Sequence, residues 1–549
     1  MSLTLCSLLL APLASLTVPQ QIGPIVERTP IESPVPSGGA HFGVDLVVEG
    51  ELMAVAQPED APGSSAGRVW IYERGADGDW ALTAELVPDD PEPEQNFGDV
   101  LALSGDLLAV SAPYDDGVVG PEQGAVYLFR RGVDGTWTQE AKLRASDAKA
   151  GAFFGQAIAL DGDRVVVGTP RWYIDFPDYY GKVYVFERDA GGNWSETATL
   201  GGISTFTWNF GADLALDGDR LMVGAADGSP AGFLAAGRAY LYELQPGAGG
   251  AAPSWTLEHI FVPPAGTADD FVGAAFAMDD DWVAISAPGD GGTIAFWEQQ
   301  PDGTWVTDQL LAYPDGDNQF TDFGGSLEHR PGQLLVGASQ ADSASGVFMA
   351  GAVYLYTRDG AGDWQVAHRF EAAGLTTGDR FGQAVAFAGD RVVVGAYGTD
   401  LLPTMGWVGR VYEFDLEPLS GDVEALSLAA GGTQALELDA GYARAGDLHL
   451  VLGSLSGTAP ATPIAGGLEL PLVVDAYLLL TLTSPAAAPI VNPLGVLDAG
   501  GTADAAVVIP PNAPASLAGL TLHHAFVAID PLTAQATFVS NALALQLNP

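Results

Sequence analysis

Short runs of alternating apolar and polar residues follow one another along the first three quarters of the chain. The clearest stretch, residues 154–200, reads FGQAIALDGDRVVVGTP, then a variable loop, then GKVYVFERDAGGNW and SETATL. Alternation over four to eight residues is typical of half-buried β-strands, and an Asp-Gly pair between two such runs predicts a tight hairpin turn. The pattern therefore predicts four antiparallel strands in this stretch.

The same arrangement recurs along the chain, and every copy begins with a Phe-Gly pair or a close variant of it. The copies begin at Phe42, Phe97, Phe154, Phe210, Phe323 and Phe381, and one copy is split as Phe271-Val272-Gly273. The third strand carries an aromatic pattern such as VYLF, and in the first six copies a Trp opens the fourth strand. Four-stranded repeats of about 50 to 60 residues are typical of β-propellers, so seven copies predict seven blades.

The seventh copy is incomplete. It ends near Asp415 after its third strand, whereas residues 25–32 precede the first copy and belong to no blade. We expect residues 25–32 to supply the missing outer strand of blade seven, because joining the two ends of the chain removes the open edge of the ring.

A second region follows the repeats. From residue 417 onward the chain is rich in Leu, Ala, Gly and Pro, with strand-like runs at 447–454, 476–482, 503–510 and 522–529. Turn clusters separate these runs, as in a small β-sandwich. The fold class is therefore all-β: a seven-bladed β-propeller over residues 20–416, followed by a small C-terminal β-sandwich-like module over residues 417–549.

Three features of each copy resemble FG-GAP repeats. They are the Phe-Gly start, the Gly-Ala-Pro-like end of the second strand, as in Gly168-Thr169-Pro170, and the Gly-x-Val-Tyr strand. FG-GAP repeats build the head of integrin α subunits and occur in many secreted bacterial proteins, so the resemblance over residues 24–416 implies an adhesion-like or ligand-binding propeller. Integrin-type blades hold Ca²⁺ in the hairpin between strands one and two. Here that hairpin is shortened to turns such as LDGDR, so the chain departs from the family at those sites.

The charge of the chain and its N-terminal segment limit the partners and the cellular location that we expect. The chain has 21 Lys and Arg against 69 Asp and Glu, a net charge of −48, which argues against nucleic-acid and membrane-surface partners. Residues 1–19 form a short apolar stretch like a secretory signal peptide and contain the single cysteine, Cys6. No later apolar run reaches membrane-spanning length. We expect a secreted, extracellular or cell-surface monomer without disulfides and without a membrane span.

Candidate ligand-binding residues lie in the loops between the second and third strands. These loops emerge on the same face of the blades as the links between blades, which we name the upper face. Aromatic side chains gather in the loop of blade three, and one more lies in the loop of blade seven: Trp172, Tyr173, Phe176, Tyr179, Tyr180 and Trp407. They either pack locally or contact an extracellular protein or glycan, and both interpretations stay open.

One acidic stretch offers oxygen ligands. PDGDNQFTDFG contains Asp315, Asp317 and Asp322, which could bind Ca²⁺, and a solvated acidic loop is the alternative. We expect no other cofactor.

The sequence contains no nucleophile elbow, phosphate loop or zinc-helix motif. The recurring Asp-Gly-x-Trp segments, such as Asp134 to Trp137 and Asp302 to Trp305, predict turns followed by a Trp packed between blades. We therefore expect a binding or adhesion scaffold rather than an enzyme. A propeller-type polysaccharide hydrolase or lyase and a structural cell-envelope protein are the alternatives.

Overall fold

The computed structural model describes most of the chain beyond residue 24, and the predicted signal segment, residues 1–19, lies outside the described residues. The described residues are 25–549 except 60–65, 76–77, 119, 171–180, 202–208, 227–236, 248–251, 263–270, 280, 290, 317–319, 359–361, 401–405, 417–418, 422, 424, 441–443, 445, 460, 465–467, 486–488 and 499–501. They divide into two compact units. One contains Ile31–Gly389 and Val393–Val411, and the other contains the described residues up to Pro30, Asp390–Val392 and Tyr412–Pro549.

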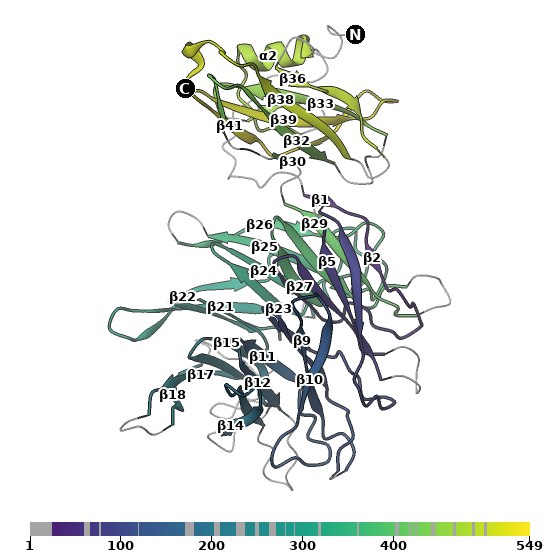
Figure 1. Ribbon diagram of the computed structural model, residues 1–549, viewed down its shortest axis with the longest axis vertical. Helices are drawn as coiled ribbons and strands as arrows, with labels where there is room; N and C mark the ends of the chain where they lie inside the picture. Colours follow the sequence, from purple (N-terminus) through teal and green to yellow (C-terminus); the bar gives the residue numbers. More distant parts are fainter. Residues whose placement is uncertain are drawn as a thin grey trace. The chain divides into compact units, whose positions relative to one another are not determined.

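Six sheets of four antiparallel strands follow one another along the described part of the repeat region, and they are blades one to six (Figure 1). Their strands are β3 (Leu46–Glu49), β4 (Leu52–Gln57), β5 (Arg68–Arg74) and β6 (Trp80–Leu86); β7 (Leu101–Ser104), β8 (Leu107–Ala112), β9 (Ala125–Arg131) and β10 (Trp137–Leu143); β11 (Ala157–Asp161), β12 (Arg164–Thr169), β13 (Lys182–Arg188) and β14 (Trp194–Gly201); β15 (Phe210–Asp217), β16 (Arg220–Ala225), β17 (Arg238–Gln245) and β18 (Ser254–Phe261); β19 (Phe276–Met278), β20 (Trp282–Ala287), β21 (Thr293–Gln299) and β22 (Trp305–Ala312); β23 (Phe323–Arg330), β24 (Gln333–Ala338), β25 (Ala352–Arg358) and β26 (Trp364–Phe370).

Blade seven combines both ends of the repeat region. Its inner strands are β27 (Ala384–Ala388), β28 (Arg391–Ala396) and β29 (Arg410–Asp415), and its outer edge is formed by β1 (Val26–Glu27) and β2 (Ile31–Glu32). Both short strands pair antiparallel with β29, with Val26 opposite Asp415 and Ile31 opposite Val411. The predicted closure by residues 25–32 is confirmed.

The Phe-Gly pair is explained by the turn that begins each blade. The glycine of the pair adopts a left-handed conformation, with φ of 101° at Gly155, which a side chain would strain. A second glycine, before the third strand of the preceding blade, presses against the Phe: a Cβ on Gly124 would overlap the carbonyl oxygen of Phe154. A Cβ on Gly409 would overlap that of Phe42 in the same way, so blade seven joins blade one through the same contact.

The split copy in blade five follows the same plan with the residues shifted by one. Val272 takes the buried place of the phenylalanine and forms the bridge with Gly237. Phe271 therefore occupies the position that directly precedes the Phe-Gly pair in the other blades.

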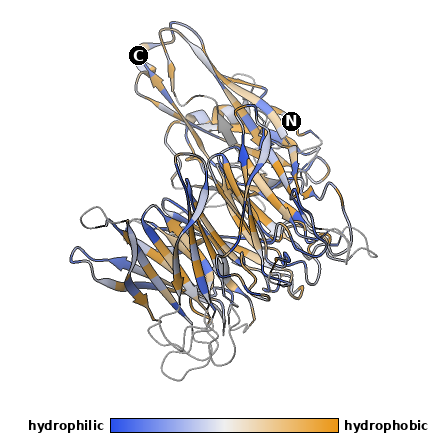
Figure 2. Cartoon of the chain, turned by 60° about the horizontal axis from the view of Figure 1, so that its bottom comes forward, coloured by the Kyte–Doolittle hydropathy of each residue, from blue (hydrophilic) through white to orange (hydrophobic). Residues whose placement is uncertain are grey.

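Apolar side chains pack between neighbouring blades. In Figure 2 the ribbon is coloured orange where the strands contain apolar residues. Trp137 packs against the buried cluster shared by blades one and two, and Trp194 against that of blades two and three. The Asp134 carboxylate accepts hydrogen bonds from the backbone N–H of Thr136, at 3.1 Å, and from its hydroxyl, at 2.6 Å, which holds the hairpin turn. The interpretation of Asp-Gly-x-Trp as turn and packing residues is confirmed.

The C-terminal module contains two main sheets. One has the order β30-β32-β38-β36, and the other has the order β31-β41-β39-β33-β37 with β40 beside β39; β34 and β35 form a separate pair. The elements are β30 (Leu419–Gly421), β31 (Ala425–Ser427), β32 (Gly432–Asp439), β33 (Leu448–Ser454), β34 (Thr462–Pro463), β35 (Glu469–Leu470), α2 (Ala476–Thr483), β36 (Ile490–Val491), β37 (Leu494–Val496), β38 (Thr502–Ile509), the 3₁₀ turn η5 (Ala515–Leu517), β39 (Thr521–Ile529), β40 (Ala536–Val539) and β41 (Leu543–Asn548). Side chains from both sheets share one buried core.

Three of the four predicted strands of this module are present, as β33, β38 and β39. The prediction of a strand at 476–482 was wrong, because this segment is helix α2. The Asp475 carboxylate accepts hydrogen bonds from the N–H groups of Tyr477 and Leu478, at 2.9 and 2.8 Å, and so caps the helix. Leu is also a strong helix former, so capping and propensity together favour a helix here.

Candidate ligand-binding face

The two faces of the propeller differ in their exposed aromatic side chains. Among the described residues, the Phe, Tyr and Trp side chains that are more than a third exposed are Tyr114 (37%), Phe320 (73%), Phe348 (58%) and Trp407 (55%). Tyr114, Phe348 and Trp407 lie in loops between the second and third strands, and Phe320 lies in the link from blade five to blade six. All four therefore lie on the upper face.

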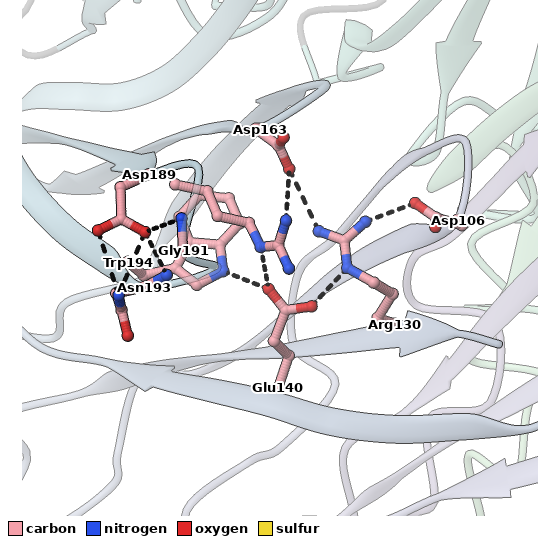
Figure 3. A network of polar contacts seen from close by, with 9 residues as sticks. Asp106, Arg130, Glu140, Asp163, Asp189, Gly191, Asn193 and Trp194 are labelled. Carbon is pink, nitrogen blue, oxygen red and sulfur yellow. Dashed lines mark hydrogen bonds and ion pairs between the residues drawn. The ribbon is translucent and has the colours of Figure 1, made fainter.

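The opposite face contains the tight turns of the blades, and charged groups at the junction of blades two and three pair with one another. Between blades two and three, Arg130 contacts Asp106 at 2.6 Å, and both Arg130 and Arg188 contact Glu140 (Figure 3). Glu140 also accepts a hydrogen bond from the indole Nε1 of Trp194 at 2.7 Å. The Arg188–Glu140 pair and the Trp194–Glu140 hydrogen bond link blade two to blade three.

On the upper face, the residue directly before each Phe-Gly position has a left-handed backbone although it is not glycine. The φ angles of these seven residues lie between 53° and 61°, and every one of them is partly exposed. We name them the inner rim: His41, Asn96, Phe153, Asn209, Phe271, Asp322 and Arg380. Their carbonyl groups accept turn hydrogen bonds, as from Val44 N–H to the His41 oxygen at 3.1 Å.

Three residues in the loops between second and third strands share this conformation. Glu122, Met349 and Trp407 have φ of 54°, 50° and 56°, and we name them the outer rim. Their carbonyl oxygens accept the N–H groups of inner-rim residues; His41 N–H lies 3.2 Å from the Trp407 oxygen, and Phe153 N–H lies 3.1 Å from the Glu122 oxygen. Backbone hydrogen bonds across the junction between two blades thus position both rims.

Trp407 is the predicted binding residue that the structure describes, and its surroundings are aromatic and acidic. The backbone N–H of Trp407 donates a hydrogen bond to the Asp400 carboxylate at 2.7 Å. The centroid of the indole ring lies 5.7 Å from that of the His41 ring. The His41 ring meets Tyr397 edge-on at 5.4 Å, and its Nδ1 lies 3.9 Å from the Glu59 carboxylate. Burial lowers the pKa of His41, and the charge of Glu59 opposes that effect. The indole is therefore held in place at its backbone while its ring stays accessible.

The predicted residues of the blade-three loop, Trp172, Tyr173, Phe176, Tyr179 and Tyr180, lie outside the described residues. At the junction of blades two and three, Phe153 meets the exposed Tyr114 edge-on, with ring centroids 5.2 Å apart. The residue types in the sequence did not predict either rim. The inner rim can nevertheless be located in the sequence once the fold is known, because its residues directly precede the Phe-Gly positions.

The structure places the predicted metal ligands in separate groups. The Asp315 carboxylate accepts a hydrogen bond from the Tyr354 hydroxyl at 2.7 Å and pairs with Arg369 at 2.7 Å. Asp322 belongs to the inner rim and accepts a hydrogen bond from the Ser339 hydroxyl at 2.6 Å, while burial raises its pKa. Asp317 lies outside the described residues.

The Asp315 arrangement recurs in other blades. In blade three the Asp147 carboxylate accepts from the Tyr184 hydroxyl at 2.6 Å and pairs with Lys182. The link into each of these blades thus places a carboxylate on the tyrosine of the third strand. Within the described part of the chain, no group of three His, Cys, Asp or Glu side chains is placed to hold a metal ion.

Comparison with a protein-family model agrees with this plan. A model of the FG-GAP repeat matches residues 80–129, 137–186 and 364–414. A comparison with curated proteins finds no match. Among solved structures, the chain is similar to Sqt1 of Chaetomium thermophilum, crystallised bound to the N-terminus of the ribosomal protein L10; the identity is 13%, the TM-score is 0.39, and the match covers 67% of this chain and 86% of that chain. Of the helices in the described residues, none has the length and apolar character needed to cross a membrane. The chain contains FG-GAP repeats, and its repeat region forms a seven-bladed β-propeller.

Proposed function

We propose that this protein is a secreted or cell-surface scaffold that binds an extracellular protein or glycan through the upper face of its propeller. One observation carries the proposal: the exposed aromatic side chains of the described propeller all lie on that face. Exposed aromatic groups are unfavourable in water, and they are enriched where proteins contact partners. The apolar segment 1–19 supports export.

The backbone of this face suits a binding role. Binding sites are commonly loops positioned by a rigid scaffold. Here the backbone carbonyl of Trp407 accepts a hydrogen bond from the His41 N–H, and the backbone N–H of Trp407 donates one to the Asp400 carboxylate. A ligand that meets this indole would therefore restrict few further degrees of freedom, which favours affinity.

We include the aromatic loop of blade three in the proposed contact surface: Trp172, Tyr173, Phe176, Tyr179 and Tyr180. In the sequence the loop connects β12 to β13, as the loops with the exposed Tyr114, Phe348 and Trp407 connect the second and third strands of their blades. A calcium ion is not part of the proposal, because Asp315 and Asp322 are engaged in different groups.

The experiment compares Trp407→Ala with the wild-type protein on glycan and peptide arrays. Val133→Ala is the matched control, since Val133 is fully exposed in a hairpin of the lower face. Trp407→Ala should weaken retention of the wild-type ligands at least about tenfold, as at a binding hot spot. Its melting temperature should change little, because the side chain is 55% exposed. Undiminished retention by Trp407→Ala, or a wild-type protein that retains no ligand, would contradict the proposal.

A further inference from the structure

The edge strand β37 of the C-terminal module is apolar and exposed. Among the described strands, β37 pairs with β33 alone. Leu494 and Val496 are 51% and 61% exposed, and Val491, just before the strand, is 49% exposed. Charged side chains are a common protection of an exposed sheet edge against pairing with another chain. Here residues 476–497 contain no charged residue, although the chain has a net charge of −48. The edge therefore lacks the charges that oppose such pairing.

The backbone groups of β37 alternate in direction. The Pro493 carbonyl accepts an N–H of β33 at 2.8 Å, and the Leu497 N–H donates to the Asp447 carbonyl, directly before β33, at 2.9 Å. Successive residues of an antiparallel strand direct their N–H and C=O groups to opposite sides, so Leu494 and Val496 direct theirs away from β33. Within the described part of the chain, no hydrogen bond engages these outward groups of Leu494 and Val496.

The side chains of β37 continue an apolar face. Leu494 and Val496 lie opposite Leu450 and Leu448 of β33. Leu450 is buried in the cluster that includes Leu478 of helix α2, and Leu448 packs against that cluster. Because opposite residues of paired strands have their side chains on the same face, Leu494 and Val496 belong to the face that α2 covers. They remain more than half exposed, so the cover ends before the edge of the sheet.

The segment Leu494-Gly495-Val496 is self-complementary. When two such strands pair antiparallel about a two-fold axis at Gly495, Leu494 of each copy lies opposite Val496 of the other. Each of these two pairs can exchange two backbone hydrogen bonds through its outward groups. The same register places the exposed leucine and valine side chains of the two copies next to one another, on one face of the joined sheet.

We propose that two copies of this chain associate through β37, which pairs antiparallel with β37 of the second copy. A second copy supplies, in one register, both the missing hydrogen bonds and an apolar cover for Leu494 and Val496. Two chains with a net charge of −48 repel one another, and contact through the uncharged segment 476–497 keeps that repulsion low. The inference departs from the monomer that we expect from the sequence. Such a dimer has two of the proposed ligand-binding faces.

The test uses sedimentation velocity of the full chain at about 1–100 μM, since small interfaces bind weakly. Val496→Pro removes an outward N–H and leaves the pairing with β33 in place, because proline is tolerated where the N–H of an edge strand faces solvent. Val496→Lys adds a charge to the edge. The matched control is Leu532→Lys, which replaces a 94% exposed leucine in the turn between β39 and β40.

The wild type and Leu532→Lys should dimerise, and both Val496 variants should have dissociation constants at least about tenfold higher. Circular dichroism melts should match the wild type for all three variants, because the replaced side chains are exposed. Added salt should favour the dimer, since it screens the repulsion between two acidic chains. A wild type that stays monomeric at the highest concentration, a dimer that both Val496 variants retain, or a dimer that dissociates as salt is added would overturn the inference.

Discussion

The closure of the ring depends on a buried ion cluster at the outer edge of blade seven. Asp415, in β29, contacts Arg391 Nε at 2.7 Å and Arg28 Nε at 2.8 Å, and Arg391 also contacts Glu413 at 2.9 Å. Asp415, Glu413 and Arg391 are each only 4% exposed. Because Arg28 belongs to the N-terminal segment that pairs with β29, the Asp415 carboxylate connects that segment to the third strand of blade seven.

We predict that Asp415→Ala lowers the free energy of unfolding of the propeller by about 3–5 kcal/mol. The variant removes one buried ion-pair partner from Arg391 and one from Arg28. Breaking a buried ion pair from one side has a cost of this size. The control is Glu32→Ala, which removes the 3.1 Å pair between Glu32 and Arg410 on the same β29 strand. The Glu32 side chain is 55% exposed, so this loss should be about 0.5 kcal/mol or less.

Urea denaturation followed by tryptophan fluorescence measures this effect. All 12 tryptophans lie in the repeat region, between Trp70 and Trp407, so the signal reports the propeller and not the C-terminal module. The effect of Asp415→Ala should persist at high salt, where exposed pairs are screened. Equal effects of Asp415→Ala and Glu32→Ala would refute the reasoning, since they would show that burial of the cluster adds nothing to its contribution.

Three further predictions follow from the structure. Gly124→Ala should destabilise the propeller far more than Gly151→Ala, because both glycines have positive φ but only the Gly124 Cβ would overlap the Phe154 carbonyl; thermal unfolding by fluorescence compares them. The His524 imidazole is fully buried beside the Tyr477 hydroxyl, and burial lowers its pKa to about 4 from 6.5. The unfolded chain therefore takes up a proton first as the pH falls from 6.5, and by pH 4 the C-terminal module should lose about 3 kcal/mol more stability than a His524→Gln variant, as circular dichroism melts would show. Chelation of divalent cations should leave the propeller melting temperature unchanged, and a drop of several degrees would contradict the placement of Asp315 against Arg369.

The blades were predictable from sequence because their signals are local. Each repeat contains its own signals: apolar residues with a period of two, an Asp-Gly turn, and a Trp that opens the fourth strand. Ring closure could also be predicted, since an incomplete seventh copy and an unassigned segment at residues 25–32 are complementary. The ion cluster that secures the closure was not predictable, because Arg28 and Asp415 are far apart in sequence and only the fold brings them together.

Helix α2 is an element whose type the pattern of apolar residues did not determine. A run of seven mostly apolar residues at 476–482 does not distinguish a buried strand from a buried helix, because neither periodicity is visible in it. The information that decides the matter is the single side chain before the run: Asp475 caps the first turn through two backbone N–H groups. A capping residue carried more information here than the seven residues that follow it.

The inner rim was beyond prediction for a different reason. The residue before each Phe-Gly position differs between blades, from His41 to Arg380, so no residue type marks the position. Only the folded structure shows that all seven residues share a left-handed backbone. Glycine would satisfy that backbone at every blade, yet none of the seven positions contains it. The repeat keeps glycine where the blades touch, because a Cβ there would overlap the next blade. It excludes glycine at the partly exposed inner rim, where packing of the ring does not fix the residue type. If the upper face binds a ligand as proposed, we expect the variable inner-rim position, rather than the recurring motif beside it, to affect which ligand is bound.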